Sequence, residues 1–323
     1  MALPSGVKRN PMSNFIGFDG GGTKTECAVL DGAGRALGRA VAGPSNPLRV
    51  GLEQACRALG EAGAAALAQA SLTPQQVTAA CAGLAGAGRP HVVAGVTPFL
   101  QKTFPQALVH VTTDFEIALE AEAGAGPGIV LIAGTGSSAY GRNAAGQTAR
   151  AGGHGPWAGD EGSAYDIGRR AVAAAARASD AAGKSSEFAE AILRALECPA
   201  WDELIERIAA HPDDVFPRVF PVVVEAAAAG HAAARQLLFE AALALAAIAR
   251  SVVRRLSLGE QEFVLVKTGG VFGRSRWLDD TLDSILREAA PRAGITLLRT
   301  APAIGAARLA QRLAAARTAQ HGR

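Results

Sequence analysis

The sequence predicts an α/β protein of two lobes, each a mixed sheet flanked by helices, with a helical insertion in the second lobe. Short apolar runs alternate with stretches of helical period. A strand, a glycine–threonine loop and a returning strand occur twice, near 15–30 and near 129–142. The chain has 323 residues, 49% of them hydrophobic, which suits a globular protein of about two domains.

The first lobe begins with an expected antiparallel meander of three strands. Phe15 to Phe18 is a short apolar run, and Glu26 to Leu30 returns beside it across a glycine tip. Arg35 to Ala42 follows the turn at 31–34. The next elements alternate: helix 51–70, strand 77–84, helix 90–101, strand 107–111 and helix 115–122. This order predicts a mixed sheet with helices packed on it.

The second lobe repeats this layout after a glycine-rich joint at 124–128. Its predicted elements are strands at 129–132, 139–142 and 147–151, a helix at 164–177, helices at 185–196, 201–209, 212–228 and 232–256, a strand at 263–266, a helix at 277–289, a strand at 295–298 and a last helix from 302 to 315. Ser163 or Asp160 is the expected cap of the helix at 164. The repetition lies in topology and not in sequence, which indicates a weak internal duplication.

These elements place the domain boundaries. We expect a polar, disordered leader at 1–14, which lacks the apolar core of a signal peptide. The first lobe then covers 15–123 and the second 124–301, with the helical insertion at about 180–256. The C-terminal helix, 302–318, is a candidate to pack back on the first lobe.

Composition argues against nucleic-acid and membrane partners. The formal net charge is +3, and the charges are dispersed along the chain. The most apolar helix, around Ala241 to Ala249, lies between Glu240 and Arg250 and is too short to span a bilayer. The four cysteines stand alone with no C-x-x-C pair, which favours reduced thiols in a cytoplasmic protein and not a zinc ribbon.

The first glycine loop is a candidate phosphate site. Gly21 and Gly22 remove side chains from the tip, so backbone N–H groups can approach a phosphate closely. Thr23 adds a hydroxyl donor, and Lys24 is the fourth predicted phosphate-binding residue of this loop. Asp19, at the strand end, is placed to hold a hydrated magnesium ion. The alternative is an ordinary glycine-rich hairpin turn, and the pattern is not a Walker A loop.

Two later loops extend this interpretation. Gly134, Thr135 and Gly136 follow the first strand of the second lobe, and Ser137 and Ser138 continue that loop. We expect a nucleoside triphosphate between pseudo-symmetric lobes to meet backbone N–H groups of both glycine–threonine loops. The third loop has glycines at Gly269, Gly270 and Gly273, and its flat backbone suits an adenine ring.

The motifs DGGGT, TTD, GTGS, GDEGS and GG-V-F-G occur in this order over about residues 15–310. The chain thereby resembles the BadF/BadG/BcrA/BcrD ATPase family and, within it, the N-acetylglucosamine kinases. The resemblance implies an actin-like (ribonuclease H-like) fold and the use of ATP and Mg²⁺. It also implies phosphoryl transfer to the 6-hydroxyl of an amino sugar, a cleft that closes by domain motion, and a homodimer.

Asp114 holds the TTD position and is the matching general base. A primary alcohol is a poor nucleophile, so a carboxylate within hydrogen-bond reach is needed to orient it and take its proton. The alternative is that Asp114 caps the helix from Phe115, and the two roles are compatible.

The resemblance also assigns a sugar site. Asp160 of GDEGS would accept hydrogen bonds from sugar hydroxyls, although helix capping would also explain it. Asn46 matches a sugar-binding amide, although Asn-Pro is also a common turn. The remaining members of this site are Gly153, His154, Gly155, Ser137 and Ser138. Leu48 and His154 depart from aromatic residues of animal relatives, which leaves specificity for the acetyl group open.

Three other functions are alternatives. The activator ATPases of the wider family hold an iron–sulfur cluster with cysteines near the second-lobe phosphate loops, and the GDEGS region here has none. A second group of glucose kinases has a C-x-C-G…C zinc motif, which is absent. A sugar sensor without kinase activity would not need Asp114. Within the kinase interpretation, glucosamine is the alternative to N-acetylglucosamine.

Overall fold

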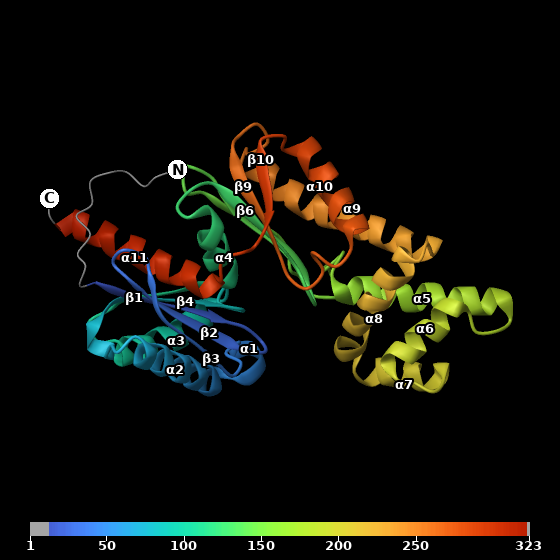
Figure 1. Cartoon of the computed structure of the whole chain (residues 1–323), viewed down its shortest axis with the longest axis horizontal. Coiled ribbons are helices and arrows are strands. Elements are labelled where there is room, and N and C mark those ends of the chain that lie inside the picture. The colour runs from blue at the N-terminus through green and yellow to red at the C-terminus, as the bar shows by residue number, and fades with distance from the viewer. Residues whose placement is uncertain (1–12, 322–323) are drawn as a thin grey trace. The chain divides into compact units, whose positions relative to one another are not determined.

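The computed structural model describes residues 13–321 (Figure 1). The described chain divides into two compact units. The first unit runs to Ala125 and takes up the C-terminal segment from Leu298, and the second unit is Gly126–Leu297. Most of the expected leader, residues 1–12, lies outside the described residues, whereas Asn14 begins the first strand.

The first unit is built on a five-stranded sheet of order β3-β2-β1-β4-β5. Its strands are β1 (Asn14–Gly20), β2 (Thr25–Asp31), β3 (Ala36–Ala42), β4 (Val77–Leu84) and β5 (Leu108–Thr113). The first three form the expected antiparallel meander, and β4 and β5 run parallel to β1. The pairing Gly20↔Thr25 closes the β1–β2 hairpin and leaves the glycine loop beyond the sheet edge.

Helices cover both faces of this sheet (Figure 1). They are α1 (Pro47–Val50), α2 (Leu52–Gln69), α3 (Pro90–Thr103), α4 (Asp114–Ala123) and α11 (Pro302–His321), with a 3₁₀ turn at Pro74–Gln76. Ile16 and Phe18 point to the core under α2 and α3, whereas Phe15 points to the core under α4 and α11. This alternation follows the two-residue period of a strand.

Gly17 is required where α11 crosses the sheet. A Cβ at Gly17 would lie 2.2 Å from the backbone nitrogen of Ala307. The C-terminal helix therefore packs directly on the backbone of β1, which is possible only at a residue without a side chain.

The second unit repeats the first sheet. Its order, β10-β9-β6-β7-β8, is that of the first sheet read from the other edge. The strands are β6 (Gly128–Ala133), β7 (Ser137–Arg142), β8 (Thr148–Gly152), β9 (Phe263–Thr268) and β10 (Ala293–Leu297). β6, β7 and β8 are antiparallel, and β9 and β10 are parallel to β6. The predicted duplication of topology is therefore confirmed.

The insertion between β8 and β9 is helical, as expected. Its helices are α5 (Ala164–Ala182), α6 (Glu187–Leu196), α7 (Trp201–Ala210), α8 (Pro212–Ala228) and α9 (Ala232–Arg255), and α10 (Arg276–Ala289) follows β9. Within residues 13–321, α9 alone is long and apolar enough to cross a bilayer, and half of its most apolar stretch is buried inside the protein. The expectation that this helix is too short to span a bilayer is therefore wrong, because α9 has 24 residues. It packs on β7, α8 and α10, which agrees with its interpretation as a core helix.

The sequence missed α1 and placed some helix ends too early. α1 is only four residues long, and its Asn-Pro start reads as a turn. Of the two expected caps of α5, Ser163 is the one used: its side chain accepts from the N–H of Asp166. All four cysteines are free thiols, three of them buried, as expected.

Candidate active site

The first glycine loop presents free backbone donors at its tip. The N–H of Gly21 donates to the carbonyl of Lys24 at 3.0 Å, which closes the turn. The carbonyl of Gly21 accepts from the N–H groups of Ser45 and Asn46, both at 3.0 Å. The N–H group of Gly22 has no hydrogen bond to any part of the chain that the structure describes. A bound phosphate oxygen could satisfy it.

Cations flank this loop on two sides. The Lys24 ammonium pairs with Glu26 at 2.5 Å. Arg49, from the last turn of α1, lies against Gly22, where a Cβ would be 2.9 Å from its Nη1 atom. Arg49 is not predictable from the sequence, because no motif links a residue of α1 to the glycine loop. A side chain at position 22 would displace the guanidinium.

Asp19 and Asp114 lie near each other at the ends of β1 and β5. Burial, and next the neighbouring charge of Asp114, raise the pKa of Asp19 to about 7. Two carboxylates that share a site repel, so a cation beside Asp19 would favour its ionised form.

Asp114 is the first residue of α4 and not its cap. Thr113 is the N-cap, and its side chain accepts from the N–H of Glu116. The capping explanation for Asp114 is therefore wrong, because Thr113 already fills that position. The Asp114 carboxylate accepts from the N–H of Phe115 at 3.1 Å, which fixes it at the start of the helix.

No all-protein metal cage was found. No group of three or more His, Cys, Asp or Glu side chains is arranged to hold a metal within residues 13–321. A magnesium ion in a phosphotransfer site usually keeps several waters and takes one or two carboxylates plus phosphate oxygens. Asp19 fits this donor set, since it stands beside the glycine loop at the end of β1.

Asn46 acts as a helix cap. Its side-chain oxygen accepts from the N–H of Leu48 at 3.0 Å, and Pro47 takes the first helical position. The Asn-Pro pair thus forms the start of α1, the structural alternative weighed above. The amide nitrogen of Asn46 remains available to an acceptor. Leu48 is 43% exposed beside it.

In the second unit, hydrogen bonds bring two predicted loops and the start of α5 together. The carbonyl of Gly134 accepts from the N–H of Ala164 at 2.8 Å. Asp160 accepts from the N–H of Ser137 at 3.1 Å, and the Ser137 hydroxyl donates to the carbonyl of Glu161 at 2.7 Å. These bonds join the GTGS loop to the GDEGS loop and to the start of α5.

Asp160 is buried against the GTGS loop in an unusual backbone conformation. Its φ is +62°, in the left-handed region that most residues avoid. A Cβ at Gly136 would lie 2.7 Å from the Asp160 carboxylate, so this glycine makes room for the acid. Burial raises the pKa of Asp160, and the hydrogen bond from Ser137 opposes the shift. Because Ser163 caps α5, Asp160 is not the helix cap.

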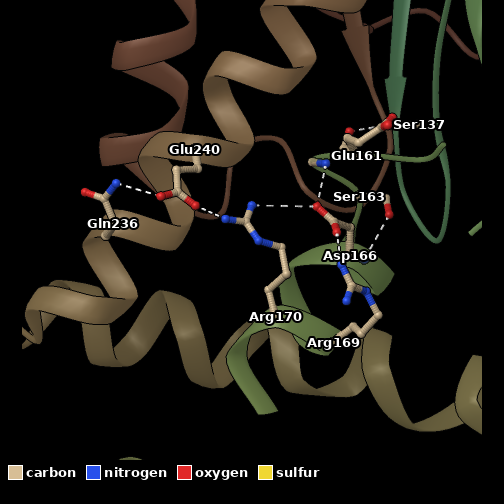
Figure 2. Close-up of polar contacts among 9 residues, drawn as sticks. Ser137, Glu161, Ser163, Asp166, Arg169, Arg170, Gln236 and Glu240 are labelled. Atoms are coloured by element: carbon tan, nitrogen blue, oxygen red, sulfur yellow. Dashed lines mark hydrogen bonds and ion pairs between the residues drawn. The ribbon is translucent and has the colours of Figure 1, made fainter. Parts of the chain in front are cut away.

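A charged network fixes the GDEGS loop from outside (Figure 2). Asp166 accepts from the N–H of Gly162 at 3.1 Å and pairs with Arg169 at 3.2 Å. Arg170 links Asp166 to Glu240 of α9. The loop is thereby tied to two helices of the same unit, which holds it in a fixed position.

The segment 153–155 lies next to the GTGS loop through strand pairing. The N–H of Gly153 donates to the carbonyl of Ser137 at 2.8 Å. A Cβ at Gly153 would be 3.2 Å from the Cβ of Ser138. His154 is exposed, and Gly155 has a φ of +86°. The predicted sugar residues of the second unit are therefore neighbours.

The third loop is held close to β6. The φ of Gly269 is +113°, and a Cβ there would lie 2.2 Å from the carbonyl oxygen of Ala133. The N–H of Gly273 donates to Asp279 at 2.9 Å. Asp279 also pairs at 3.2 Å with the buried Lys267, and Asp283 does so at 2.7 Å.

A pocket of about 560 Å³ opens between these loops and α8. Gly134, Thr135 and Gly270 line it, so two of the predicted nucleotide loops share one pocket. The other lining residues are Ala164, Pro217, Phe220, Pro221, Val224, Glu225 and Arg274. Its walls are apolar with a few polar groups, which is typical of a small-ligand site. The sequence analysis missed the residues of α8, because the helix read only as part of an insertion.

Two sheets of the same mixed order, each with a glycine loop after its first strand, define the actin-like class of ATPases and sugar kinases. The chain matches the BadF/BadG/BcrA/BcrD ATPase family over residues 16–310. It therefore belongs to that family, and the predicted family and fold are confirmed.

Similar proteins agree with this membership. The chain is 32% identical to the N-acetylmuramic acid/N-acetylglucosamine kinase of Clostridium acetobutylicum, over 93% of this chain and 99% of that protein. It is 32% identical to the N-acetyl-D-glucosamine kinase of Dictyostelium discoideum, over 92% and 97%. A crystal structure of a proposed N-acetylglucosamine kinase from Chromobacterium violaceum superposes with a TM-score of 0.74, at 26% identity over 92% and 98% of the chains.

Proposed function

We propose that this protein is an ATP-dependent amino-sugar kinase that transfers the γ-phosphate of ATP to the 6-hydroxyl of N-acetylglucosamine. The main support is the pocket lined by Gly134, Thr135 and Gly270, together with the buried carboxylate of Asp160, which contacts the same GTGS loop at Gly136 and Ser137. A nucleotide pocket next to a hydroxyl-binding acid is the arrangement that a sugar kinase needs.

The nucleotide is proposed to bind to three glycine loops. Its adenosine part occupies the pocket between the loops of the second unit and α8. Its phosphates bind backbone N–H groups, which form anion sites wherever glycines leave them exposed. The proposed residues are Gly21, Gly22, Thr23, Lys24, Gly134, Thr135, Gly136, Gly269, Gly270 and Gly273. Asp19 would hold Mg²⁺ through water, and the ion would neutralise charge on the transferred phosphoryl group.

Asp114 is proposed as the general base. It accepts the proton of the 6-hydroxyl as the bond from O6 to the γ-phosphorus forms and the bond from that phosphorus to the bridging oxygen breaks. The electron pair of the broken bond leaves with ADP. Because Asp114 sits at a strand end and is held by a backbone N–H, its carboxylate is already oriented.

The sugar is proposed to bind through amide, carboxylate and hydroxyl groups. Asn46 offers an amide nitrogen, and Asp160 accepts from sugar hydroxyls. Ser137, Ser138, Gly153, His154 and Gly155 would border the ring. Asp160 is ordered before the sugar arrives, because Ser137 and the Asp166 network hold its loop. Such preorganisation lowers the entropic cost of binding.

A sugar panel tests this proposal. ADP release is coupled to an optical assay with N-acetylglucosamine, glucosamine and glucose, and the product is analysed by ³¹P NMR for phosphorylation at O6. We expect the highest kcat/KM with N-acetylglucosamine. A higher kcat/KM with glucosamine would make glucosamine the preferred substrate, and the protein would still be an amino-sugar kinase.

The same assay addresses the other classes. A protein that binds a sugar but releases no ADP would be a sensor. A coloured protein with iron absorbance would be an activator ATPase. We also propose that the protein is a cytoplasmic homodimer. Light scattering on the purified protein would test whether it is a dimer.

A further inference from the structure

Arg49 is a charged side chain that the sequence analysis did not connect with the active site. It lies at the end of α1, is exposed, and packs its guanidinium against Gly22. Within residues 13–321, its guanidinium forms no ion pair or hydrogen bond that would neutralise its charge. An arginine that rests on a glycine loop without a protein partner is available to an anionic ligand.

The loop beneath Arg49 offers further donors of the same kind. The N–H and carbonyl groups of Gly21 are already used inside the protein. The N–H groups of Gly22 and Thr23 find no acceptor in the described structure. A guanidinium above two free backbone donors forms an anion site, because all of these groups are donors and none accepts.

The other cation of the loop is less available. The Lys24 ammonium lies 2.5 Å from Glu26, and this carboxylate offsets its charge. Arg49 is exposed as Lys24 is, but it has no carboxylate partner among the described residues. Arg49 is therefore the stronger candidate for direct contact with an anion.

The position of Arg49 indicates which anion it meets. Asn46 and Arg49 both belong to the segment around α1, and the Asn46 backbone is bonded to Gly21. Asn46 is a proposed sugar ligand, so an anion at Arg49 would lie between the glycine loop and the acceptor sugar. In a kinase, the phosphate next to the acceptor is the terminal one.

We propose that Arg49 is a further catalytic residue, which binds the terminal phosphate of ATP and stabilises it during transfer. The inference rests on the proposed kinase function. The planar guanidinium can donate two parallel hydrogen bonds to phosphate oxygens. It would act where negative charge is redistributed as the γ-phosphoryl group moves from ADP to O6.

The test compares Arg49→Met, Arg49→Lys and Lys24→Met with a surface control, Arg57→Met. Arg57 is exposed on α2 and pairs only with its own helix. Steady-state kinetics are measured for ATP and the sugar. Calorimetry gives Kd values for ADP and for the non-hydrolysable analogue AMP-PNP.

For Arg49→Met, we expect kcat/KM for ATP to fall about 10- to 100-fold, the loss that corresponds to one hydrogen bond between charged groups. The Kd for AMP-PNP should rise while the Kd for ADP stays within about twofold, because only the analogue has a terminal phosphate. Arg49→Lys should regain part of the loss. Lys24→Met should lose less than Arg49→Met, and Arg57→Met should match the wild type.

Several results would overturn this role. An equal loss of ADP and AMP-PNP affinity would place Arg49 away from the terminal phosphate. Unchanged kinetics for Arg49→Met, or a larger loss for Lys24→Met, would contradict the proposal directly. N-acetylmuramic acid, which bears a carboxylate, is added as a second acceptor. A rise in KM for that sugar alone, with KM for ATP and the Kd for AMP-PNP unchanged, would assign Arg49 to the sugar.

The kinase function can fail separately. If the wild type phosphorylates no sugar but still prefers AMP-PNP to ADP through Arg49, the phosphate contact holds and the sugar kinase proposal does not. If the wild type phosphorylates a sugar and the preference for AMP-PNP survives Arg49→Met, the kinase proposal holds and this inference does not.

Discussion

The three acids of the candidate site differ in burial, hydrogen bonding and pKa. Asp114 stands at a helix start and accepts one backbone N–H, whereas Asp160 is buried beside a glycine. Burial raises the pKa of Asp160 and, more strongly, that of Asp19. Burial and neighbouring charge thus make these acids sensitive to the cation or hydroxyl that a substrate brings.

The base assignment gives a direct prediction. Asp114→Ala should reduce kcat by about 10²- to 10⁴-fold, because no other group would take the proton of the hydroxyl. ATP affinity should be nearly unchanged, and calorimetry measures it separately from turnover. Glu116→Gln, in the same helix turn, is the matched control and should keep most activity. Unchanged turnover in Asp114→Ala would remove the base assignment.

A substitution in the second glycine loop should affect the affinity for ATP more than the affinity for the sugar. Thr135→Val keeps the shape of the side chain but removes the hydroxyl from the pocket that is proposed to bind the nucleotide. We expect KM for ATP to rise about tenfold, equivalent to one hydrogen bond of roughly 1.4 kcal/mol, with a smaller change for the sugar. Thr148→Val, at an exposed strand start, is the control. A larger effect on the sugar would mean that Thr135 does not face the phosphates.

At the scale of elements, loops are fixed by the helices that follow or flank them. Asp166 of α5 holds the GDEGS loop by accepting from the N–H of Gly162, and Arg170 links Asp166 to Glu240 of α9 (Figure 2). Asp279 of α10 holds the third loop through Gly273. A glycine loop has a high conformational entropy when free, so such anchors decide whether it is ready for a ligand.

The anchor of the third loop can be tested with two neighbouring acids. Asp279 and Asp283 both pair with the buried Lys267, but Asp279 also accepts from the N–H of Gly273. Asp279→Ala should raise KM for ATP by about 5- to 10-fold through loss of that bond. Asp283→Ala should lower the melting temperature without this rise. Equal effects on KM would mean that the acids only stabilise the fold.

At the scale of the whole chain, the C-terminal helix completes the first unit. Residues from Leu298 return to that unit, and α11 packs on β1 across Gly17. Arg312 of α11 makes two hydrogen bonds to Glu120 of α4, at 3.0 and 2.8 Å. The return therefore depends on both close backbone packing and a partly buried ion pair.

The ion pair predicts a loss of stability. Glu120 is 3% exposed, so Arg312→Ala removes the bidentate partner of a buried carboxylate. We expect a loss of about 1–3 kcal/mol in the free energy of unfolding, less than for a fully buried pair because Arg312 is partly in water. Urea unfolding measures it. Arg57→Ala breaks an exposed pair with Glu53 and should cost less than about 0.5 kcal/mol. Equal losses would contradict the role of the Arg312 pair.

Much of the fold could be read along the chain. Strand β4 was predicted at its observed bounds, and both meanders were recognised from apolar runs between glycine turns. These signals are local, since a strand or helix shows its own period. The short α1 was missed for the same reason, because four residues are too few to show a helical period.

The candidate site was predictable only in part. Glycine loops can be recognised in the sequence, because a position without a side chain is needed wherever the backbone approaches a ligand or another strand closely. Arg49, Glu225 and Arg274 gave no such signal. Each is an ordinary charged residue in the sequence, and its importance depends on what the fold sets beside it.

The sequence alone determined the family, the two repeated sheets and the positions of the glycine loops, because these follow from local periodicity and from turns that require glycine. Only the tertiary structure decided which cation has no ion-pair partner among the described residues, which acid is buried and which helix lines the pocket. Ion pairing and burial depend on residues distant in the chain. Lys24 pairs with Glu26 and Arg49 does not, and this difference exists only once the loop and α1 are packed together.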